Sequence, residues 1–234
     1  DKNDIYCFSS QKAEEFCKSL DESYEITYLQ CALKGGGIKG SLLATIYLII
    51  LTLLFSLPLG IIAAIYLTLY AKNKTFKTIV INMIDATSGV PSIIFGFVGM
   101  VVFIPFVSIF TKKDSLSIIA GALTMSIILL PLIIKTTSEA INVVPNSYLE
   151  ASLALGTSKT QSVFKVILPS AMPGILTATL LSIGRIIGES ASLIFVMGNS
   201  IKDNVSLASN ATTLATHIYA ITSGETLEYN SACA

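Results

Sequence analysis

The pattern of apolar and polar positions divides this chain into long charge-free stretches joined by short charged segments. The charge-free stretches are residues 40–71, 86–111, 115–134 and 166–184, and the last continues past two charges to residue 201. About 20 apolar residues in a helix cross the hydrocarbon core of a bilayer, so each stretch is long enough to span a membrane. The pattern predicts an all-α integral membrane protein with four spans, at about residues 40–70, 79–110, 115–135 and 170–198.

The overall composition supports a membrane location. Hydrophobic residues make up 53% of the 234 positions and charged residues only 13%, about half the charged share of a typical soluble domain. The formal net charge is zero, so the charge balance does not indicate a nucleic-acid partner. The first expected partner is therefore the lipid bilayer.

Lysines in the connecting segments predict the orientation of the spans. Lys72, Lys74 and Lys77 lie in one short connection without an acid, and three later lysines fall on the same side when the spans are counted. Cytoplasmic loops carry an excess of lysine and arginine, so this side is predicted to be cytoplasmic. Residues 1–39 and 199–234 then form external N-terminal and C-terminal segments.

Four cysteines fall in the external segments: Cys7, Cys17, Cys31 and Cys233. An oxidising compartment permits disulfides there, and free thiols are the alternative. The sequence does not choose between them. No Cys-x-x-Cys pattern is present, and we expect neither a bound metal nor a cofactor.

The predicted cytoplasmic loop, residues 136–169, has the signals of two short helices. Ser147 with Glu150, and Ser158 with Gln161, have the spacing of helix capping boxes. Gly156 falls where a helix ending in a left-handed residue favours glycine. Pro169, at the end of the loop, is predicted to separate the second helix from the fourth span.

This loop resembles the coupling loop of binding-protein-dependent ABC importer permeases. The family pattern is Glu-Ala-Ala, three residues, Gly, nine residues, Ile, one residue, Leu-Pro. The residues at its positions are Glu150, Ala151, Ser152, Gly156, Val166, Leu168 and Pro169, in which serine replaces the second alanine and valine the isoleucine. The resemblance implies a rigid helix pair that docks on an ATPase, with small side chains at positions 151 and 152 permitting close approach. A chance helical hairpin is the alternative.

The only arginine of the chain, Arg185, lies inside the fourth apolar stretch. At about 1.5 Å of rise per residue from Pro173, its Cα lies roughly 18 Å into a hydrocarbon core about 30 Å thick. A charge at the centre of a bilayer costs about 2.5 to 3.5 kcal/mol on insertion scales, so we expect it to have a function. Glu189 follows four residues later, on the same face of an uninterrupted helix, and is the predicted counter-ion.

An arginine at this depth favours an oxyanion as the substrate. The guanidinium group stays charged, and its planar fork matches phosphate oxygens bidentately. Ser190, together with Ser88 and Ser92 at helical spacing on one face of the second span, is predicted to supply hydroxyl donors. The alternative is a purely structural ion pair between Arg185 and Glu189, although buried pairs are often no more stabilising than apolar packing.

Three segments resemble the A-type permease subunit of phosphate ABC importers: residues 184–191, 89–96 and 213–219. The resemblance covers about residues 35–234. It implies a type I permease helix bundle whose first and last spans lie before Asp1 and after Ala234.

The same resemblance implies a set of partners and a location. We expect a homologous permease subunit as heterodimer partner, two ATPase subunits on the cytoplasmic side and an external phosphate-binding protein. ATP hydrolysis then belongs to another polypeptide, because this chain lacks a Walker-type phosphate loop and is not expected to be an enzyme. The implied location is the bacterial cytoplasmic membrane.

Other functions remain open from the sequence. The first is a permease for another oxyanion, molybdate or sulfate. The second is an intramembrane enzyme with Glu189 or Asp85 as its acid, and the third is a structural or receptor subunit. Asp85 itself has two possible depths, about 12 Å inside the membrane if its helix begins at Lys77, or the interface. The interface is favoured because an acid would repel an anion.

Overall fold

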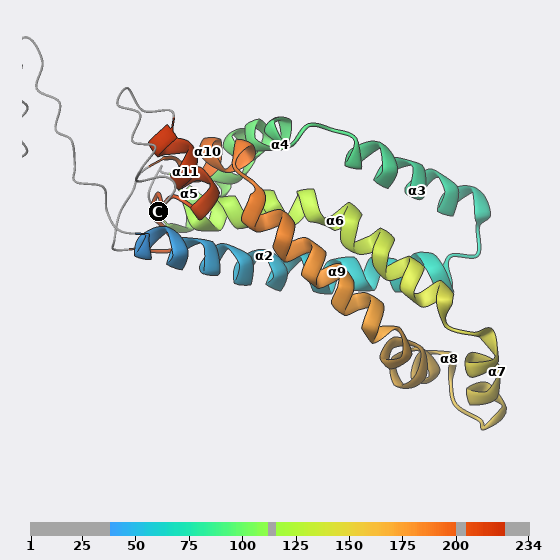
Figure 1. Ribbon diagram of the computed structural model, residues 1–234. Coiled ribbons are helices and arrows are strands. Elements are labelled where there is room, and N and C mark those ends of the chain that lie inside the picture. The colour runs from blue at the N-terminus through green and yellow to red at the C-terminus, as the bar shows by residue number, and fades with distance from the viewer. Residues whose placement is uncertain (1–37, 112–115, 200–204, 223–234) are drawn as a thin grey trace, which may run out of the picture.

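The computed structural model describes residues 38–111, 116–199 and 205–222 as a bundle of helices (Figure 1). Three long helices form its centre: α2 (Lys39–Ile65), α6 (Ile118–Val143) and α9 (Leu168–Gly188). In the described residues, four helical segments are long and apolar enough to cross a membrane: Lys39–Tyr70, Ser92–Thr111, Ile118–Val143 and Lys159–Gly188. The predicted number of spans is confirmed, whereas three of their predicted boundaries differ.

The first span agrees with its prediction. Helix α2 continues into a π-helical turn, η1 (Tyr66–Tyr70), and the helix runs through Pro58 without ending. Its buried face consists mainly of small side chains at helical spacing: Gly40, Ser41, Ala44, Thr45, Leu48, Thr52, Ser56, Gly60 and Ala64. Small residues let membrane helices approach closely. At Gly60, a Cβ atom would lie 2.5 Å from the Cγ2 of Ile133, so α2 and α6 form a tightly packed centre.

The second span is broken, so the predicted continuous helix over residues 79–110 is wrong. Helix α3 (Lys74–Ser88) ends before the Gly89–Pro91 bend, and α4 (Ser92–Val98), η2 (Gly99–Phe103) and α5 (Ile104–Thr111) follow it. Proline has no backbone N–H and disfavours helical geometry in the residue before it, which explains the break at Pro91.

The third span is longer than predicted. Helix α6 continues to Val143, eight residues past the expected end at residue 135, and it passes through Pro131 without ending. The charge of Lys135 suggested the end of the span. Buried Thr137 and Ile141 continue the packed face beyond it, so that charge lies within the helix.

The fourth span also differs from its prediction. Helices α8 (Lys159–Ser162), η3 (Val163–Ile167) and α9 form one continuous helix from Lys159 to Gly188. Pro169 does not break it, because proline lies in the first turn of α9, directly after the wide π turn in which the N–H of Leu168 bonds to the carbonyl of Val163. At the other end, the helix stops at Gly188 and a separate helix, α10 (Ala191–Met197), follows. The predicted single span over 170–198 is therefore wrong.

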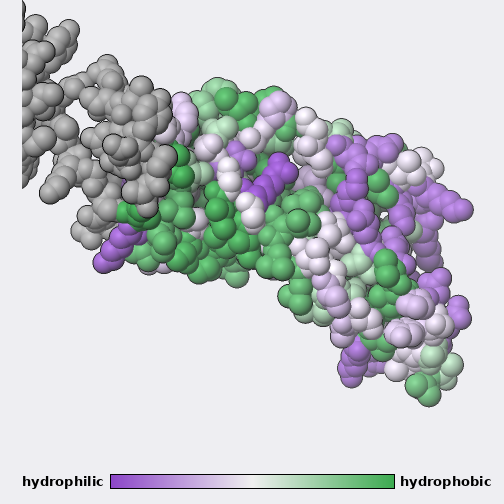
Figure 2. Space-filling view, viewed as in Figure 1, coloured by the Kyte–Doolittle hydropathy of each residue, from purple (hydrophilic) through white to green (hydrophobic). Residues whose placement is uncertain are grey.

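Apolar side chains cover much of the outer surface. Figure 2 shows a broad hydrophobic region over α2 and its neighbours, whereas hydrophilic residues gather toward the α3 and α7 end. The exposed residues of α2 include Ile50, Leu54, Leu59 and Ile62. A membrane protein exposes large apolar side chains to lipid and buries its small and hydroxyl-bearing ones between helices, which matches this distribution.

The two ends of the bundle separate the polar connections. The Lys72 connection and the hairpin of α7 (Asn146–Ala154) and α8 lie at one end, and α11 (Leu214–Thr222) lies beside the start of α2 at the other (Figure 1). This arrangement agrees with the lysine-based orientation, which stays a prediction. The four cysteines and residues 1–37 lie outside the described part of the chain.

A buried polar network joins α11 to the start of α2. His217 is 6% exposed, and its Nδ1 is hydrogen-bonded to the hydroxyl of Ser41, which is 3.1 Å from that of Thr212. The backbone N–H of Leu214 donates to Thr45 at 3.0 Å. The lone histidine is therefore a structural residue that joins α11 to α2.

Acidification from about pH 8 to about pH 5 is expected to loosen α11 from α2. Burial lowers the pKa of His217 below its ordinary value, so the docked helix favours the neutral ring. The stabilisation is complete above the ordinary pKa of about 6.5 and is lost as the pH falls below it. Hydrogen exchange of residues 214–222, corrected for the intrinsic pH effect, should be faster at the lower pH. A His217→Gln variant should lose this pH dependence; equal pH dependence in both proteins would contradict the assignment.

Candidate functional site

Arg185 lies in the last turn of α9 with its side chain exposed. The buried face of this helix carries Ala178, Ser182 and Ile186, and position 185 lies at the edge of that face, about 60° from its centre. In the described part of the chain, the ion pair present is Lys135–Asp85, so no acidic side chain there neutralises Arg185. The guanidinium is free to meet a ligand.

The positions flanking Arg185 leave open space beside it. A Cβ atom at Gly184 or at Gly188 would meet no other atom of the described chain within 4 Å. The structure therefore presents a small-residue strip around the arginine on which no other described helix packs. Within the chain, these glycines do not serve close helix packing.

Glu189 does not pair with Arg185, contrary to the prediction. The helix ends at Gly188, and Glu189 takes an extended conformation with φ −79° and ψ 125°. Its Oε1 accepts a hydrogen bond from the backbone N–H of Ser192 at 3.2 Å, in the first turn of α10. A carboxylate at a helix N-terminus satisfies otherwise unpaired backbone donors. Glu189 is thus a helix cap next to the arginine, and the i, i+4 geometry is absent because the helix is interrupted.

The three predicted serines lie at helix ends. Ser190 directly precedes α10 and is half-buried, while Ser92 begins α4. Ser88 ends α3, where its hydroxyl donates to the carbonyl of Ile84 at 2.9 Å. Because the 89–91 bend separates Ser88 from Ser92, the two do not share one helix face as predicted.

Helices α4 and α10 are brought together by close backbone contact. A Cβ atom at Gly96 would lie 2.8 Å from the Cα of Ser192, whose hydroxyl contacts the sulfur of Met125 in α6 at 3.9 Å. The start of α10, and with it Glu189 and Ser190, therefore packs against α4 at the level of Met125. Two helix breaks, at residues 89–91 and 189–190, adjoin this region (Figure 1). Irregular backbone at membrane depth is tolerated where it is buried in protein or lines a water-filled cavity.

The predicted coupling loop is a helical hairpin closed at Gly156. Gly156 has a φ of 82°, and its N–H bonds to the carbonyl of Leu153 while that of Thr157 bonds to Ser152. This is the Schellman arrangement, in which a left-handed glycine ends a helix. The Ser158–Gln161 capping box is confirmed. The Ser147–Glu150 box is wrong, because α7 starts at Asn146, after Pro145, without a side-chain cap.

The residues of the coupling motif have different roles in the hairpin. Glu150 and Ala151 are exposed on α7, where a partner can reach them. Ser152 is 8% exposed, and its hydroxyl bonds to those of Thr157 and Ser162 at 2.8 and 2.9 Å. It therefore holds the two helices of the hairpin together, and its predicted role in close approach to a partner stays a prediction.

Leu168 and Pro169 lie in the first turn of α9, beyond the tip of the hairpin. The apolar tip is instead formed by residues that the motif does not include: Tyr148, Leu153 and Leu155, the last 85% exposed. Apolar residues in a predicted cytoplasmic loop were the signal that could have identified them.

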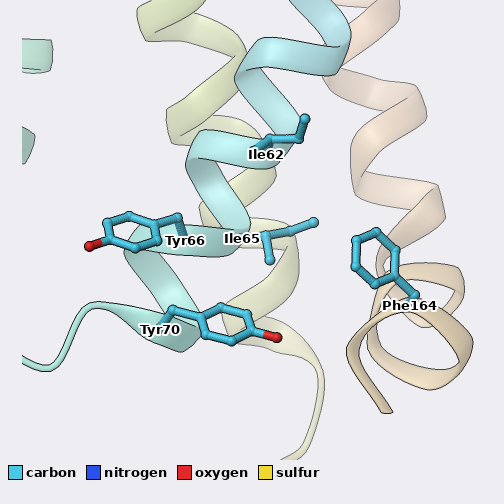
Figure 3. Close-up of a pocket in the computed structure, with 5 residues that line it drawn as sticks. All are labelled: Ile62, Ile65, Tyr66, Tyr70 and Phe164. Atoms are coloured by element: carbon cyan, nitrogen blue, oxygen red, sulfur yellow. The ribbon is translucent and has the colours of Figure 1, made fainter. Parts of the chain in front are cut away.

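The hairpin is fastened to the end of the first span. Tyr70 donates a hydrogen bond to Thr160 at 3.3 Å, and the ammonium of Lys159 lies 4.7 Å above the Tyr70 ring. Beside this junction is a small apolar pocket of about 290 Å³ in which Ile65 faces Phe164 (Figure 3). No predicted site residue lines it. The pocket belongs to the junction of η1 with η3.

Comparison with known proteins assigns the family. Residues 56–223 match the family described as binding-protein-dependent transport system inner membrane component. This chain belongs to that family. It is therefore a multi-pass inner-membrane protein of the ABC importer permease type, as the sequence predicted.

Similar permeases come from several bacteria. The probable ABC transporter permease protein YqgI of Bacillus subtilis is 36% identical over 164 residues, which cover 70% of this chain and 54% of the relative. The phosphate transport system permease protein PstA of Haemophilus influenzae is 34% identical over 160 residues, 68% of this chain and 55% of the relative. The chain thus spans about half the length of these curated relatives.

A solved structure supports the fold. The inward-facing MetNI methionine ABC transporter superposes with a TM-score of 0.59 at 21% identity, covering 84% of this chain and 85% of the matched one. This likeness shows the type I permease fold. In the described residues, no group of three or more His, Cys, Asp or Glu side chains has the arrangement of a metal site.

Proposed function

We propose that this chain is a membrane-spanning subunit of an ATP-driven importer of inorganic phosphate, and that Arg185 binds the anion in transit. The observation that carries the proposal is the exposed guanidinium of Arg185 within an apolar helix of a transport-family protein, unpaired with any acid of the described residues. An arginine without a counter-ion at that depth is costly unless an anion or water reaches it.

The chemistry of the group matches the proposed substrate. A guanidinium offers a planar set of donors that binds two oxygens of one phosphate, and it stays protonated at every working pH. The open strip at Gly184 and Gly188 leaves room beside it. The hydroxyls of Ser92 and Ser190, at the two helix breaks, are the proposed further donors, and that of Ser88 becomes one when it leaves the carbonyl of Ile84. Relatives named as phosphate permeases support phosphate over another oxyanion.

Glu189 is proposed to act on the same pathway in a second way. Its carboxylate caps α10 one residue beyond the end of α9. Glu189 is therefore close to Arg185 in sequence but does not form an ion pair with it. A nearby negative charge weakens anion binding, which favours release over trapping. This replaces the counter-ion role expected from an uninterrupted helix.

The partners follow from the proposed function. The exposed apolar tip of α7 and the residues Glu150 and Ala151 are the proposed contact with an ATPase subunit, and a homologous permease subunit is proposed to complete the pathway beside α9. A phosphate-binding protein would deliver the anion at the opposite end. Rigid-body movement of the hairpin then opens and closes access to Arg185 alternately from each side.

Anion competition tests the substrate. The complete transporter, reconstituted in vesicles with its partner subunits and binding protein, should take up labelled phosphate when ATP is supplied. Sulfate or molybdate at about 100-fold excess should lower that uptake by less than about half. This result corresponds to at least about 100-fold weaker binding of the competing anion, a difference in binding free energy of about 3 kcal/mol. Strong competition by molybdate or sulfate, with little phosphate uptake, would transfer the assignment to that anion.

A further inference from the structure

A pair of charged residues joins α6 to α3, away from Arg185 on α9. Lys135 of α6 donates to the carboxylate of Asp85 in α3 at 2.9 Å, across 50 residues of sequence. Both side chains remain about half exposed, at 57% and 48%. The pair joins α3, a helix that buries none of its own residues, to the packed centre of the bundle.

Lys135 lies within the candidate span formed by α6. Lys135 precedes the end of α6 at Val143 by eight residues, or about 12 Å of helix axis. Since α3 runs beside this half of α6 (Figure 1), Asp85 lies at the same level of the bundle as Lys135. The depth of Asp85 in the membrane, for which the sequence left two positions open, stays a prediction.

Arg185 on α9 and Lys135 on α6 lie at two levels of the bundle. The two helices run antiparallel, and Gly174 of α9 packs against Ala140 of α6, so Arg185 lies eleven residues along α9 from that contact while Lys135 lies five residues back along α6. Lys135 is therefore roughly 9 Å closer to the hairpin end. Residues 85–92 connect the levels, because they carry Asp85, Ser88 and then Ser92 past the 89–91 bend. Figure 2 shows hydrophilic residues on one face both near the junction of α4 with α10 and over α3.

Stability alone does not account for this pair. Partly exposed ion pairs contribute little to stability, while charged side chains within a membrane span are costly and usually mark ion pathways. Glu139, one helical turn beyond Lys135 and also exposed, adds a second acid on the same face of α6. A lysine between two acids binds an anion weakly enough to release it.

We propose that Lys135 is a second anion-binding group of the pathway, which receives the oxyanion after Arg185, and that Asp85 is the counter-ion that the anion displaces. The proposal rests on the proposed function. An ammonium is a compact, strongly hydrated charge without the forked geometry of guanidinium. An ammonium group suits a site close to the exit of the pathway, where the anion has already been selected and is released into water.

The test removes the charges but keeps the contact between the helices. In the double variant Asp85→Asn/Lys135→Gln, two amides can still hydrogen-bond across α3 and α6, whereas no cation remains. Phosphate uptake by the complete transporter should fall at least about tenfold, while Lys135→Arg should keep at least about a third of it. Lys74→Gln, which removes an exposed lysine at the start of the same α3 helix, is the matched control and should stay within about twofold of the wild type.

Asp85→Asn alone gives a kinetic signature that a structural clamp lacks. With Lys135 left unneutralised, the anion should bind more tightly and leave more slowly, so both KM and kcat for phosphate should fall by about threefold or more. Loss of helix contact alone predicts no fall in KM. Wild-type uptake by the neutral double variant, or an unchanged or raised KM in Asp85→Asn, would overturn the second site.

Chemical rescue covers the case in which a variant assembles poorly. In a subunit whose Cys7, Cys17, Cys31 and Cys233 are replaced by serine, Lys135→Cys should lose uptake, and modification with aminoethyl methanethiosulfonate, which restores an ammonium, should recover it. The uncharged hydroxyethyl reagent should not. Equal recovery with both reagents, or recovery with neither, would overturn the proposal. Arg185→Ala in the same assay separates the two hypotheses, because normal uptake there would remove the proposed transit site itself.

Discussion

Replacing Arg185 with alanine is expected to lower phosphate uptake by about 10- to 100-fold while the subunit still inserts and assembles. Charge-assisted hydrogen bonds contribute about 1.5 to 3 kcal/mol each, and about 1.4 kcal/mol corresponds to a factor of ten. Folding should tolerate the change because the side chain is exposed and unpaired among the described residues. Uptake of labelled phosphate into vesicles, normalised to the amount of assembled transporter, measures the effect.

Arg185→Lys separates charge from geometry. If the forked guanidinium selects the anion, lysine should restore only a small part of the uptake, because an ammonium cannot bind two oxygens in one plane. Lys165→Gln, which removes an exposed cation near the hairpin end of the same continuous helix, is the control and should behave like the wild type. Wild-type uptake by Arg185→Ala would end the transit-site assignment. Full activity of Arg185→Lys would show that a positive charge at this position is sufficient and that the forked geometry of guanidinium has no role.

The spans and the coupling hairpin were predictable because their signals are local. Charge-free runs identify the membrane helices directly, since water is absent from the hydrocarbon core and every charge there is costly. The Gly156 turn was equally visible, as glycine at the end of a short helix adopts the left-handed conformation at little cost. Both features depend on residues within a few positions of one another.

The helix breaks were harder to predict because apolar content does not distinguish a continuous helix from an interrupted one. The bend at residues 89–91 and the end of α9 at Gly188 both lie within charge-free or nearly charge-free sequence. Gly188 followed by an acid that caps α10 was a possible signal, but the same residues also fit an i, i+4 ion pair. The structure chooses the cap, and the counter-ion prediction was therefore wrong.

The roles that the sequence did not predict depend on contacts between residues that are not neighbours along the chain. Lys135 was taken as the end of the third span, whereas the structure pairs it with Asp85 from a helix 50 residues earlier. No local pattern encodes such a contact. The same holds for Ser152, whose small size suggested a docking surface but whose hydroxyl bonds inside the hairpin to Thr157 and Ser162.

The error at Pro169 has a mechanistic consequence. A break there would have separated the hairpin from the fourth span by a flexible joint. The continuous helix from Lys159 to Gly188 instead carries both the second helix of the hairpin and Arg185. In the proposed mechanism, a push on the hairpin would move this helix and the arginine it carries, and the Tyr70–Thr160 contact would pass the movement to the first span.

Gly156→Val is expected to reduce ATP-driven uptake to less than about a tenth of the wild-type rate, with insertion unchanged. The φ of Gly156 is 82°, and a non-glycine residue in a sparsely populated backbone region costs about 1 to 3 kcal/mol, with β-branched side chains among the least tolerant. A Cβ atom at this position would meet nothing within 4 Å, so the effect arises from the backbone rather than from a clash. The strained turn would open the hairpin and misplace the Tyr148–Leu155 tip that is proposed to contact the ATPase.

Gly156→Asn is the matched control, because asparagine is similar in size to valine but tolerates the left-handed conformation. It should retain most of the uptake and of the ATPase association, measured by co-purification from membranes. Normal uptake by Gly156→Val would argue against a coupling role for the hairpin. Equal failure of both variants would show that the ATPase requires a small residue at the docked surface. The left-handed turn at Gly156 would then have no separate role in coupling.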